Sequence, residues 1–299
     1  MDDLLITLRS NFNEVSETRG TAHSYLAMSL LQSDKGISAD MRNFILKCVE
    51  GRNLKAVASP AKDDLFTVSE NPLLDDVEKA RFHSDVATLL YPAKRTRGDI
   101  LVAVSWLSSR VSAPTEEDRT KLDRVFAYLV GTSDQVLLFS SGGTIEPRAY
   151  IDASYGVHSD YTSRTGVVIM LAGGAIGCWS GRQKIVTKSS TEAEIVALSD
   201  GISHVLWSME WLGAQGHNVR PVVVYQDNQS VLSLMKSGKN PGHRTKHMNI
   251  RYFFVKNRVE LGDVSLTYLP TADMVADMMT KPLNGATLRK LVAVLTGRV

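Results

Sequence analysis

Four acidic residues in the second half of the chain have the type and placement of a metal-dependent catalytic site. They are Asp152, Glu194, Asp227 and Asp277. Two of them end strand-like apolar runs, one lies at the start of an amphipathic helix, and one lies on a late helix. Carboxylates that converge without a cation repel one another, which raises their pKa values and costs stability. If the four meet in space, we expect them to hold two hard divalent cations, an arrangement that cleaves phosphodiesters.

Three of these positions also have a simpler structural interpretation. Asp152 could be a turn residue at the end of a strand. Asp227 precedes Asn-Gln-Ser and could serve only as a helix N-cap, a position that both Asp and Asn favour. Glu192 lies in the same first helical turn as Glu194, where the helix dipole favours either negative charge. The residues by themselves leave these alternatives open.

The elements that must position the four acids follow one another in a regular order after residue 146. Continuous apolar runs predict strands, and apolar residues at helical spacing predict helices. The expected strands cover 147–152, 166–172, 175–180, 221–226 and 264–269, and helices begin at Thr191 and Asn228, cover 244–260 and fill the end of the chain. This order predicts a mixed sheet with helices packed on it. Asp152 and Asp227 would then lie at the ends of neighbouring central strands, where α/β sheets place their sites.

The residues before 147 form a less regular series. The apolar run 4–8 predicts a short strand, and residues 40–50 predict a helix. Residues 51–75 contain two prolines and predict an extended linker, whereas 78–132 has a helical pattern. The segment Ser140-Ser141-Gly142-Gly143 predicts a boundary before the sheet.

The composition limits the class of protein. A chain of 299 residues with 43% apolar content can bury a sizeable core in two to three structural units. The two cysteines, Cys48 and Cys178, are too few for a disulfide framework or a cysteine-based zinc site, which fits a reducing compartment. No apolar run is long enough for a membrane span, and the acidic N-terminus is unlike a signal peptide. We therefore expect a soluble intracellular protein without a membrane partner.

The charge balance changes along the chain. Residues 1–146 carry 17 Lys and Arg against 21 Asp and Glu, whereas residues 147–299 carry 17 against 11. The stretch from Lys236 to Arg258 holds seven basic residues and no acidic one. A solvated helix face is the simpler interpretation of such a stretch. In a helix over 244–260, however, the basic side chains flank the core-facing stripe, and a basic row beside carboxylates favours a nucleic-acid backbone as partner.

Four residues of this stretch are the candidate nucleic-acid contacts: Arg244, Lys246, His247 and Arg251. Guanidinium and ammonium groups suit the geometry and charge of phosphate. His247 could transfer a proton, but a structural or phosphate-contacting role fits its place between Lys246 and Met248 equally well.

A series of short motifs carries a resemblance to a known family. In the second half they are Asp152-Ala153-Ser154, Ser189-Ser190-Thr191-Glu192-Ala193-Glu194, Gln226-Asp227-Asn228-Gln229-Ser230, Arg244-Thr245-Lys246-His247, Ile250-Arg251-Tyr252, Leu269-Pro270-Thr271 and Ala276-Asp277-Met278-Met279-Thr280-Lys281-Pro282-Leu283. In the first half they are Met1-Asp2-Asp3-Leu4-Leu5-Ile6, Ala22-His23-Ser24-Tyr25-Leu26, Leu89-Leu90-Tyr91, residues 93–100 and Pro114-Thr115-Glu116-Glu117. With these motifs the chain resembles a copia-type retrotransposon polyprotein fragment, the C-terminal end of reverse transcriptase plus the ribonuclease H domain.

The resemblance implies an α/β fold and a division of the chain. It implies a ribonuclease H-like mixed five-stranded sheet with flanking helices over 147–299. A mostly helical thumb/connection region over 61–146 and a truncated reverse transcriptase palm remnant over 1–60 would precede it.

The resemblance also implies an activity. The chain would be a metal-dependent endonuclease that hydrolyses the RNA strand of RNA–DNA hybrids, with two Mg²⁺ ions, or Mn²⁺ in their place, held by the four acids. Alignment of the motifs favours Glu194 over Glu192, and Asp277 over Asp273, as ligands. The hybrid is the expected partner, together with the rest of a reverse transcriptase, in the cytoplasm, the nucleus or a virus-like particle.

A second acidic pair matches a polymerase motif. Asp2 and Asp3 resemble the second half of a Tyr-x-Asp-Asp strand, but the third polymerase carboxylate would come from an upstream strand. We therefore expect no polymerase activity from this chain. The alternatives to a nuclease are a catalytically dead element remnant and a nucleic-acid-binding accessory fragment that docks on a separate polymerase.

Overall fold

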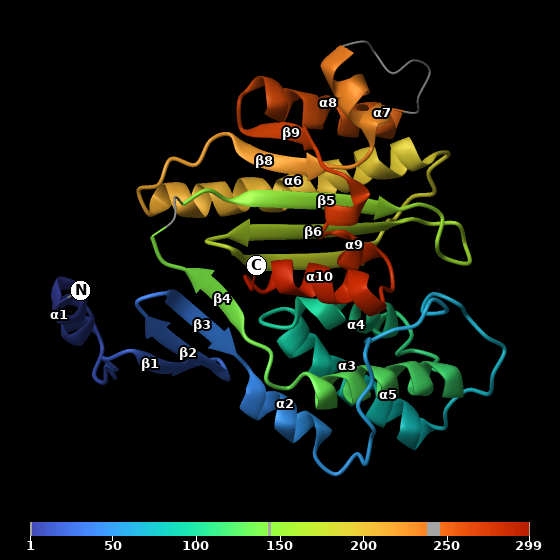
Figure 1. Ribbon diagram of the computed structural model, residues 1–299, viewed down its shortest axis with the longest axis horizontal. Helices are drawn as coiled ribbons and strands as arrows, with labels where there is room; N and C mark the ends of the chain where they lie inside the picture. Colours follow the sequence, from blue (N-terminus) through green and yellow to red (C-terminus); the bar gives the residue numbers. More distant parts are fainter. Residues whose placement is uncertain (1, 143–144, 238–245, 299) are drawn as a thin grey trace.

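The computed structural model describes residues 2–142, 145–237 and 246–298. A five-stranded mixed sheet forms the centre of the molecule (Figure 1). Its strands are β5 (Arg148–Ser154), β6 (Arg164–Leu171), β7 (Gly174–Arg182), β8 (Val222–Gln226) and β9 (Val264–Tyr268). Their order is β7-β6-β5-β8-β9. The pairs β7–β6 and β6–β5 are antiparallel, whereas the pairs β5–β8 and β8–β9 are parallel. The predicted strands and the mixed sheet are confirmed, and β5 and β8 are neighbours as expected.

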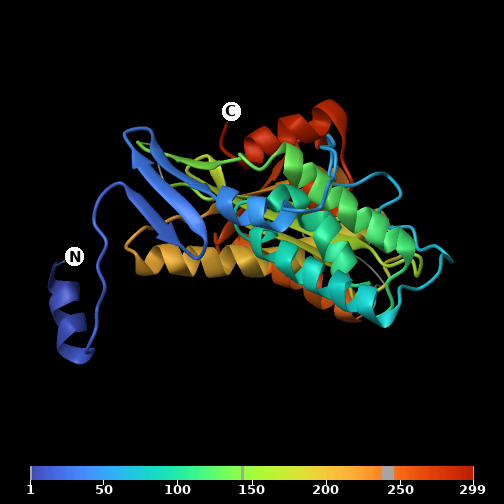
Figure 2. The ribbon, with the colours of Figure 1, turned by 90° about the horizontal axis from the view of Figure 1, so that it is seen from below.

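One face of this sheet is covered by α6 (Ser190–Ala214) (Figure 2), with α7 (Gln229–Ser237) and α8 (Lys246–Glu260) packed alongside that helix. Gly201 permits the close approach of α6 to the sheet. A Cβ added there would meet Ile151 Cδ1 at 2.7 Å and Val167 Cγ2 at 3.0 Å. The start of α6 is thereby held against β5, the strand that carries Asp152.

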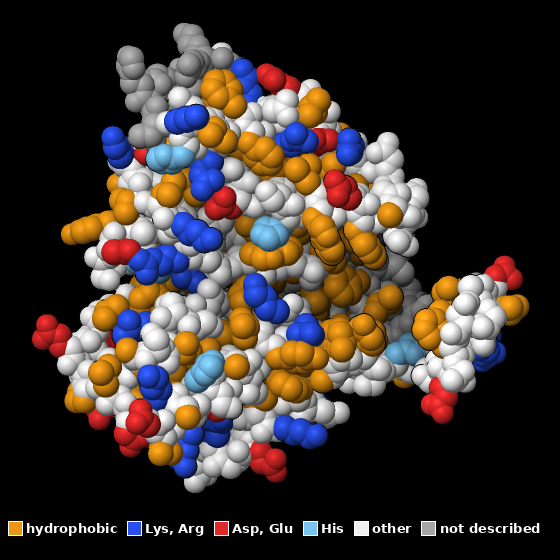
Figure 3. All heavy atoms as spheres, turned by 180° about the vertical axis from the view of Figure 1, so that it is seen from behind, with side chains coloured by type: hydrophobic (Ala, Val, Ile, Leu, Met, Phe, Trp, Pro, Cys, Tyr) orange, Lys and Arg blue, Asp and Glu red, His pale blue; other side chains and the backbone are white. Residues whose placement is uncertain are grey.

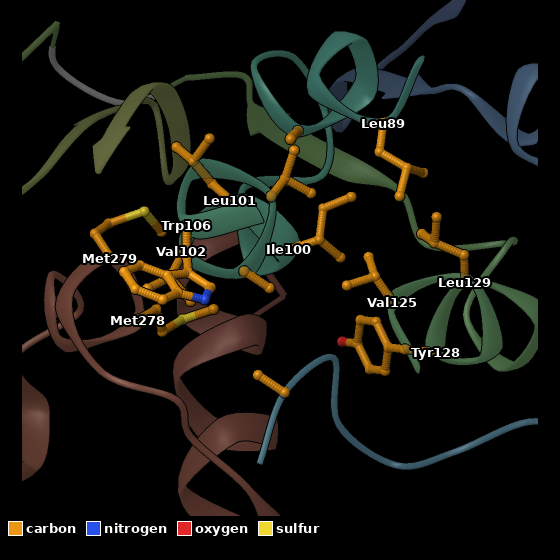
Figure 4. Packing of buried hydrophobic residues seen from close by; sticks show 14 of the residues in the cluster. Leu89, Ile100, Leu101, Val102, Trp106, Val125, Tyr128, Leu129, Met278 and Met279 are labelled. Atoms are coloured by element: carbon orange, nitrogen blue, oxygen red, sulfur yellow. The ribbon is translucent and has the colours of Figure 1, made fainter. Parts of the chain in front are cut away.

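The opposite face is covered by helices that precede and follow the sheet in the sequence. The helices that contact the sheet are α4 (Leu101–Ser108), α9 (Asp277–Thr280) and α10 (Gly285–Leu295). The same hydrophobic cluster also includes α3 (Asp76–Ala93), the 3-10 turn η1 (Gly98–Ile100) and α5 (Glu116–Gly131). Alternate residues of β6 point to opposite faces, so that Val168 joins this side while Val167 packs with α6. Figure 4 shows Trp106 of α4 beside Met278 and Met279 of α9. One hydrophobic cluster therefore joins the helical region to the sheet.

The N-terminal part forms a second sheet. Its strands are β1 (Ala22–Tyr25), β2 (Met28–Ser33), β3 (Gly36–Asp40) and β4 (Leu137–Ser140), which pair antiparallel in that order. The helix α2 (Arg42–Val49) follows β3, and a 3-10 turn, η2 (Thr271–Asp273), follows β9. Because β4 pairs with β3, and Val168 packs with the helices, contacts cross both of the expected boundaries at residues 60 and 146. The division into 1–60, 61–146 and 147–299 stays a prediction.

The strand predicted for residues 4–8 is wrong. Residues Asp2–Asn11 form the helix α1, which buries none of its side chains and lies apart from the rest of the molecule (Figure 1). A strand needs a neighbouring strand to satisfy its backbone hydrogen bonds, whereas a helix satisfies them within the segment. Asp2 and Asp3 in the first turn and Arg9 in the last turn also suit the helix dipole.

The predicted helix at 40–50, the linker after it and the helical region up to residue 132 agree with α2 to α5. None of the described helices combines the length and the apolar character that crossing a bilayer requires.

Candidate metal centre

Three of the four predicted acids meet at one edge of the five-stranded sheet. Asp152 lies on β5, Asp227 directly follows β8, and Glu194 lies near the start of α6. One carboxylate oxygen from each residue lies within 4.8 Å of those of the other two. The side chains of Asp152 and Glu194 are buried, with residue exposures of 2% and 5%, while Asp227 is half-buried. The pairing of β5 with β8 is what brings the two aspartates together, because parallel neighbouring strands end at the same edge.

The fourth acid, Asp277, lies beside Asp152. It is the first residue of α9 and does not belong to the set of three oxygens. Its pKa is raised to about 7 by burial and then by the negative charge of Asp152. Lys281 Nζ lies 2.7 Å from Asp277 Oδ1 and 3.7 Å from Asp152 Oδ2. Asp152 therefore borders both parts of the site, and a lysine lies between it and Asp277.

The three carboxylates repel one another, and a bound cation would relieve this repulsion. The pKa of Glu194 is raised well above its usual range, first by burial and then by the charges of Asp152 and Asp227. Gln226 Nε2 donates to Glu194 Oε2 at 3.2 Å, which offsets part of this effect. Buried carboxylate oxygens in mutual contact are the donor set that a hard divalent cation such as Mg²⁺ prefers. These residues fit the divalent metal that the motifs imply.

Neighbouring groups hold the acids in place. The Thr280 hydroxyl donates to Asp152 Oδ2, and Thr271 Oγ1 donates to Asp227 Oδ2 at 2.7 Å. Such partners orient metal ligands. Gln226, Thr271, Thr280 and Lys281 all lie within the motifs, but the sequence assigned no role in the site to any of them. For Lys281 a signal existed, since it lies four residues after Asp277, the spacing at which helical side chains pair.

Glu192 and Glu194, both near the start of α6, have different surroundings. Glu192 Oε2 accepts a hydrogen bond from Lys188 N at 2.8 Å, and Ser189 Oγ accepts one from Glu192 N at 3.2 Å. Glu192 therefore takes part in capping the helix, while Glu194 points into the protein. Asp273 is likewise not part of the set of three, and it is exposed and paired with Lys290 Nζ at 2.6 Å.

The helix-cap interpretation of Asp227 is excluded by its neighbour. Asn228 Oδ1 accepts from Val231 N at 3.2 Å and so caps α7 in its place. Asp227 is left to face Asp152 and Glu194.

The predicted basic row is only partly present. Arg251 Nη1 lies 3.5 Å from Asp200 Oδ1, and Arg258 Nη1 lies 3.1 Å from Asp263 Oδ2. On the face in Figure 3, Lys and Arg side chains are spread among acidic and hydrophobic ones and form no continuous stripe. Lys246 and His247 are exposed at the start of α8, and Arg244 lies outside the described residues. The role of these residues in nucleic-acid binding stays a prediction.

Comparison with known proteins gives relatives along nearly the whole chain. A family described as reverse transcriptase-like matches residues 151–277. The chain is 32% identical to the retrovirus-related Pol polyprotein from transposon RE1 of Arabidopsis thaliana, over 95% of this chain and 20% of the relative. It is 30% identical to the corresponding polyprotein from transposon TNT 1-94 of Nicotiana tabacum, over 84% of this chain and 19% of the relative. The chain thus spans about a fifth of the length of these curated relatives.

A solved structure shares the fold. The foamy viral protease-reverse transcriptase in complex with RNA/DNA hybrid matches 84% of this chain and 29% of its own, with a TM-score of 0.50 and 12% identity. The mixed five-stranded sheet with flanking helices is the ribonuclease H-like fold that the motifs predicted.

Proposed function

The chain is homologous over 95% of its length to a Pol polyprotein of a plant copia-like transposon, and from that premise we propose that it is a metal-dependent endonuclease. Its substrate is the RNA strand of RNA–DNA hybrids. The observation that carries this proposal is the convergence of Asp152, Glu194 and Asp227 on a ribonuclease H-like sheet, with Asp277 beside Asp152. Such a set of buried carboxylates lowers the stability of the fold unless a cation offsets their mutual repulsion.

The four acids are proposed as ligands of two Mg²⁺ ions, with Mn²⁺ able to replace them, since every donor is a hard oxygen. Bound ions of this kind supply a nucleophilic water and stabilise charge on the phosphate oxygens. The protein's own part is to orient the ligands. Gln226 directs Glu194, and Thr271 directs Asp227, each through one hydrogen bond.

Substrate choice is proposed to rest on the backbone of the hybrid. The 2′-hydroxyl and the groove shape distinguish RNA from DNA without reading bases. Lys246 and His247 are exposed at the start of α8 and are proposed as phosphate contacts, together with Arg251, whose guanidinium also pairs with Asp200. Phosphate contacts would make binding of the hybrid weaken with salt.

We propose no polymerase activity for this chain. Asp2 and Asp3 lie exposed on α1, which buries none of its residues. Two-metal chemistry needs carboxylates held by a surrounding structure, and α1 has no such structure around it.

The decisive experiment compares the wild-type chain with Asp227→Asn in cleavage of a labelled RNA–DNA hybrid in Mg²⁺. Losing an outer partner of a metal ligand costs roughly 10- to 100-fold in activity or metal affinity, and losing a ligand should cost more. We expect Asp227→Asn to abolish cleavage and to leave hybrid binding largely intact.

Asp273→Asn is the matched control, because Asp273 is an exposed acid that pairs with Lys290 and is not one of the four acids. Its cleavage rate should equal that of the wild type. Cleavage that persists in Asp227→Asn would contradict the site. A wild-type chain that binds the hybrid without cutting it would favour the alternative of a catalytically dead, nucleic-acid-binding remnant.

A further inference from the structure

Lys281 places its ammonium group against two of the four acids. Its ammonium nitrogen lies 2.7 Å from Asp277 Oδ1 and 3.7 Å from Asp152 Oδ2. Both acids are largely buried, and the lysine side chain is 36% exposed. Among the ion pairs formed by the described part of the chain, those of Lys281 alone involve any of the four acids.

The two parts of the site therefore differ in how the negative charge of the carboxylates is neutralised. On one side, Asp152, Glu194 and Asp227 repel one another, and only neutral donors, the Gln226 amide and the Ala153 backbone among them, reach Glu194 in the described part of the chain. On the other side, the charges of Asp152 and Asp277 meet an ammonium group. Lys281 Nζ contacts both carboxylates, at 2.7 Å from Asp277 Oδ1 and 3.7 Å from Asp152 Oδ2.

We propose that Lys281 is an internal cation that takes the place of one divalent ion between Asp152 and Asp277, and that it competes with that ion for the site. This inference rests on the proposed metal-dependent function and adds a positioning residue to it. One divalent ion binds first, at the uncompensated set of three acids. A second ion binds more weakly, because it has to displace the ammonium group from Asp152 and Asp277.

The surroundings give the displaced side chain room. Lys281 lines a cavity of about 530 Å³ whose wall also includes Ser154, His158 and Asp63. The cavity is lined by the end of β5 and by the segment before α3, and none of the three acids lines it. A lysine that leaves the acids can therefore remain next to the site.

A purely structural ion pair is the competing explanation. In that case Lys281 would only fix the start of α9, and its removal would lower stability without tightening metal binding. The two explanations differ in the sign of the effect on metal affinity, so a binding measurement on the full chain separates them.

The test is calorimetric titration of Mn²⁺ into the full-length protein without nucleic acid, for the wild type, Lys281→Met and Lys290→Met. Lys290 is the matched control, because its 2.6 Å pair with Asp273 is of the same kind but exposed and outside the site. Competition between two cations for one position is a coupling free energy, and typical couplings correspond to about 5- to 150-fold in affinity. We expect Lys281→Met to tighten the weaker Mn²⁺ site by a factor in that range and Lys290→Met to leave it unchanged.

Two further variants guard against a folding defect. Lys281→Arg keeps the charge and should keep the second site weak, whereas Lys281→Gln removes it and should behave like Lys281→Met. In a chelator, Lys281→Met should melt at a lower temperature than the wild type, and Mn²⁺ should raise its melting temperature by more. Unchanged or weakened Mn²⁺ affinity in folded Lys281→Met and Lys281→Gln would overturn the inference, as would a wild type that binds no Mn²⁺. Absence of hybrid cleavage together with the expected Mn²⁺ response would contradict the nuclease function and leave the role of Lys281 standing.

Discussion

At the scale of single residues, Asp152 links the two parts of the candidate site. It shares one set of oxygens with Glu194 and Asp227, and it shares Lys281 with Asp277. The carboxyl groups of Glu194 and Asp277 have raised pKa values, because burial and the neighbouring carboxylates disfavour their charged forms. The residues around the acids supply single hydrogen bonds that fix orientation without removing charge.

His158 has the most unusual environment among the histidines outside the site. Its ring stacks on Trp106 at a centroid distance of 5.3 Å, and neither ring nitrogen has a hydrogen-bond partner among the described residues. Its pKa is lowered to about 4, first by burial and then by the positive charges of Arg164 and Arg182. His158 is therefore neutral in the folded protein at pH 6.

This environment predicts a loss of stability in acid. In the unfolded chain the His158 imidazole has a pKa of about 6.5, so it binds a proton below that pH. In the folded chain it binds a proton only near pH 4. The free energy of unfolding therefore decreases as the pH falls from about 6.5 to about 4. The loss should approach about 3 kcal/mol, since each pKa unit corresponds to about 1.4 kcal/mol. Denaturant unfolding at pH 7, 5.5 and 4.5 measures it. His158→Phe keeps the stacking and should flatten this part of the profile, and a profile as steep as that of the wild type would contradict the assignment.

At the scale of elements, the site depends on how closely α6 lies on β5 and β6. Glu194 enters from the first turns of α6, and Gly201, two turns later, is the point of closest approach to Ile151 and Val167. A shift of the helix away from the sheet would carry Glu194 away from Asp152. Positioning of the acid and packing of the helix are therefore coupled.

Two glycines on the same helix test this coupling. Gly201→Ala would place a methyl group 2.7 Å from Ile151 Cδ1, and such overpacking typically costs about 1–3 kcal/mol. Gly213→Ala meets nothing within 4 Å, and its better helix propensity should leave stability unchanged or raise it by up to about 1 kcal/mol. Thermal unfolding of both variants, with Mn²⁺ titration, is the measurement. We expect Gly201→Ala to lose both stability and metal affinity, and equal behaviour of the two variants would show that α6 tolerates displacement.

At the scale of the whole molecule, the helical region and the five-stranded sheet share one hydrophobic cluster. Val168 and Met170 of β6, with Met278 and Met279 of α9, pack against α4 and α10. Asp277 directly precedes the two methionines. The segment that carries the fourth acid is thus anchored in part by α4, a helix that lies upstream of the sheet in the sequence.

Removal of the first 146 residues should therefore weaken the rest. A fragment over 147–299 would expose the apolar face that α4 now covers, and a large exposed apolar patch promotes association. We expect the fragment to bind a hydrophobic dye, to melt at a lower temperature than the full chain and to bind Mn²⁺ more weakly. A monomeric fragment that melts cooperatively at the temperature of the full chain would instead support 147–299 as an independent domain.

The sequence by itself determined the kind and order of most elements, because apolar alternation and helical spacing are local properties of the chain. It also predicted that Asp152 and Asp227 lie close together, because each was expected at the end of one of two neighbouring strands. Its motifs favoured Glu194 and Asp277 as the other two ligands. Only the tertiary structure decided that Arg251 faces Asp200 and that Lys281 contacts both Asp152 and Asp277. These contacts depend on which distant segments pack together. The structure also decided that residues 2–11 form a helix, because none of the described strands pairs with that segment. Lys281 and Asp152 lie far apart in sequence, so their 3.7 Å approach arises from packing of α9 on the sheet and from no local pattern.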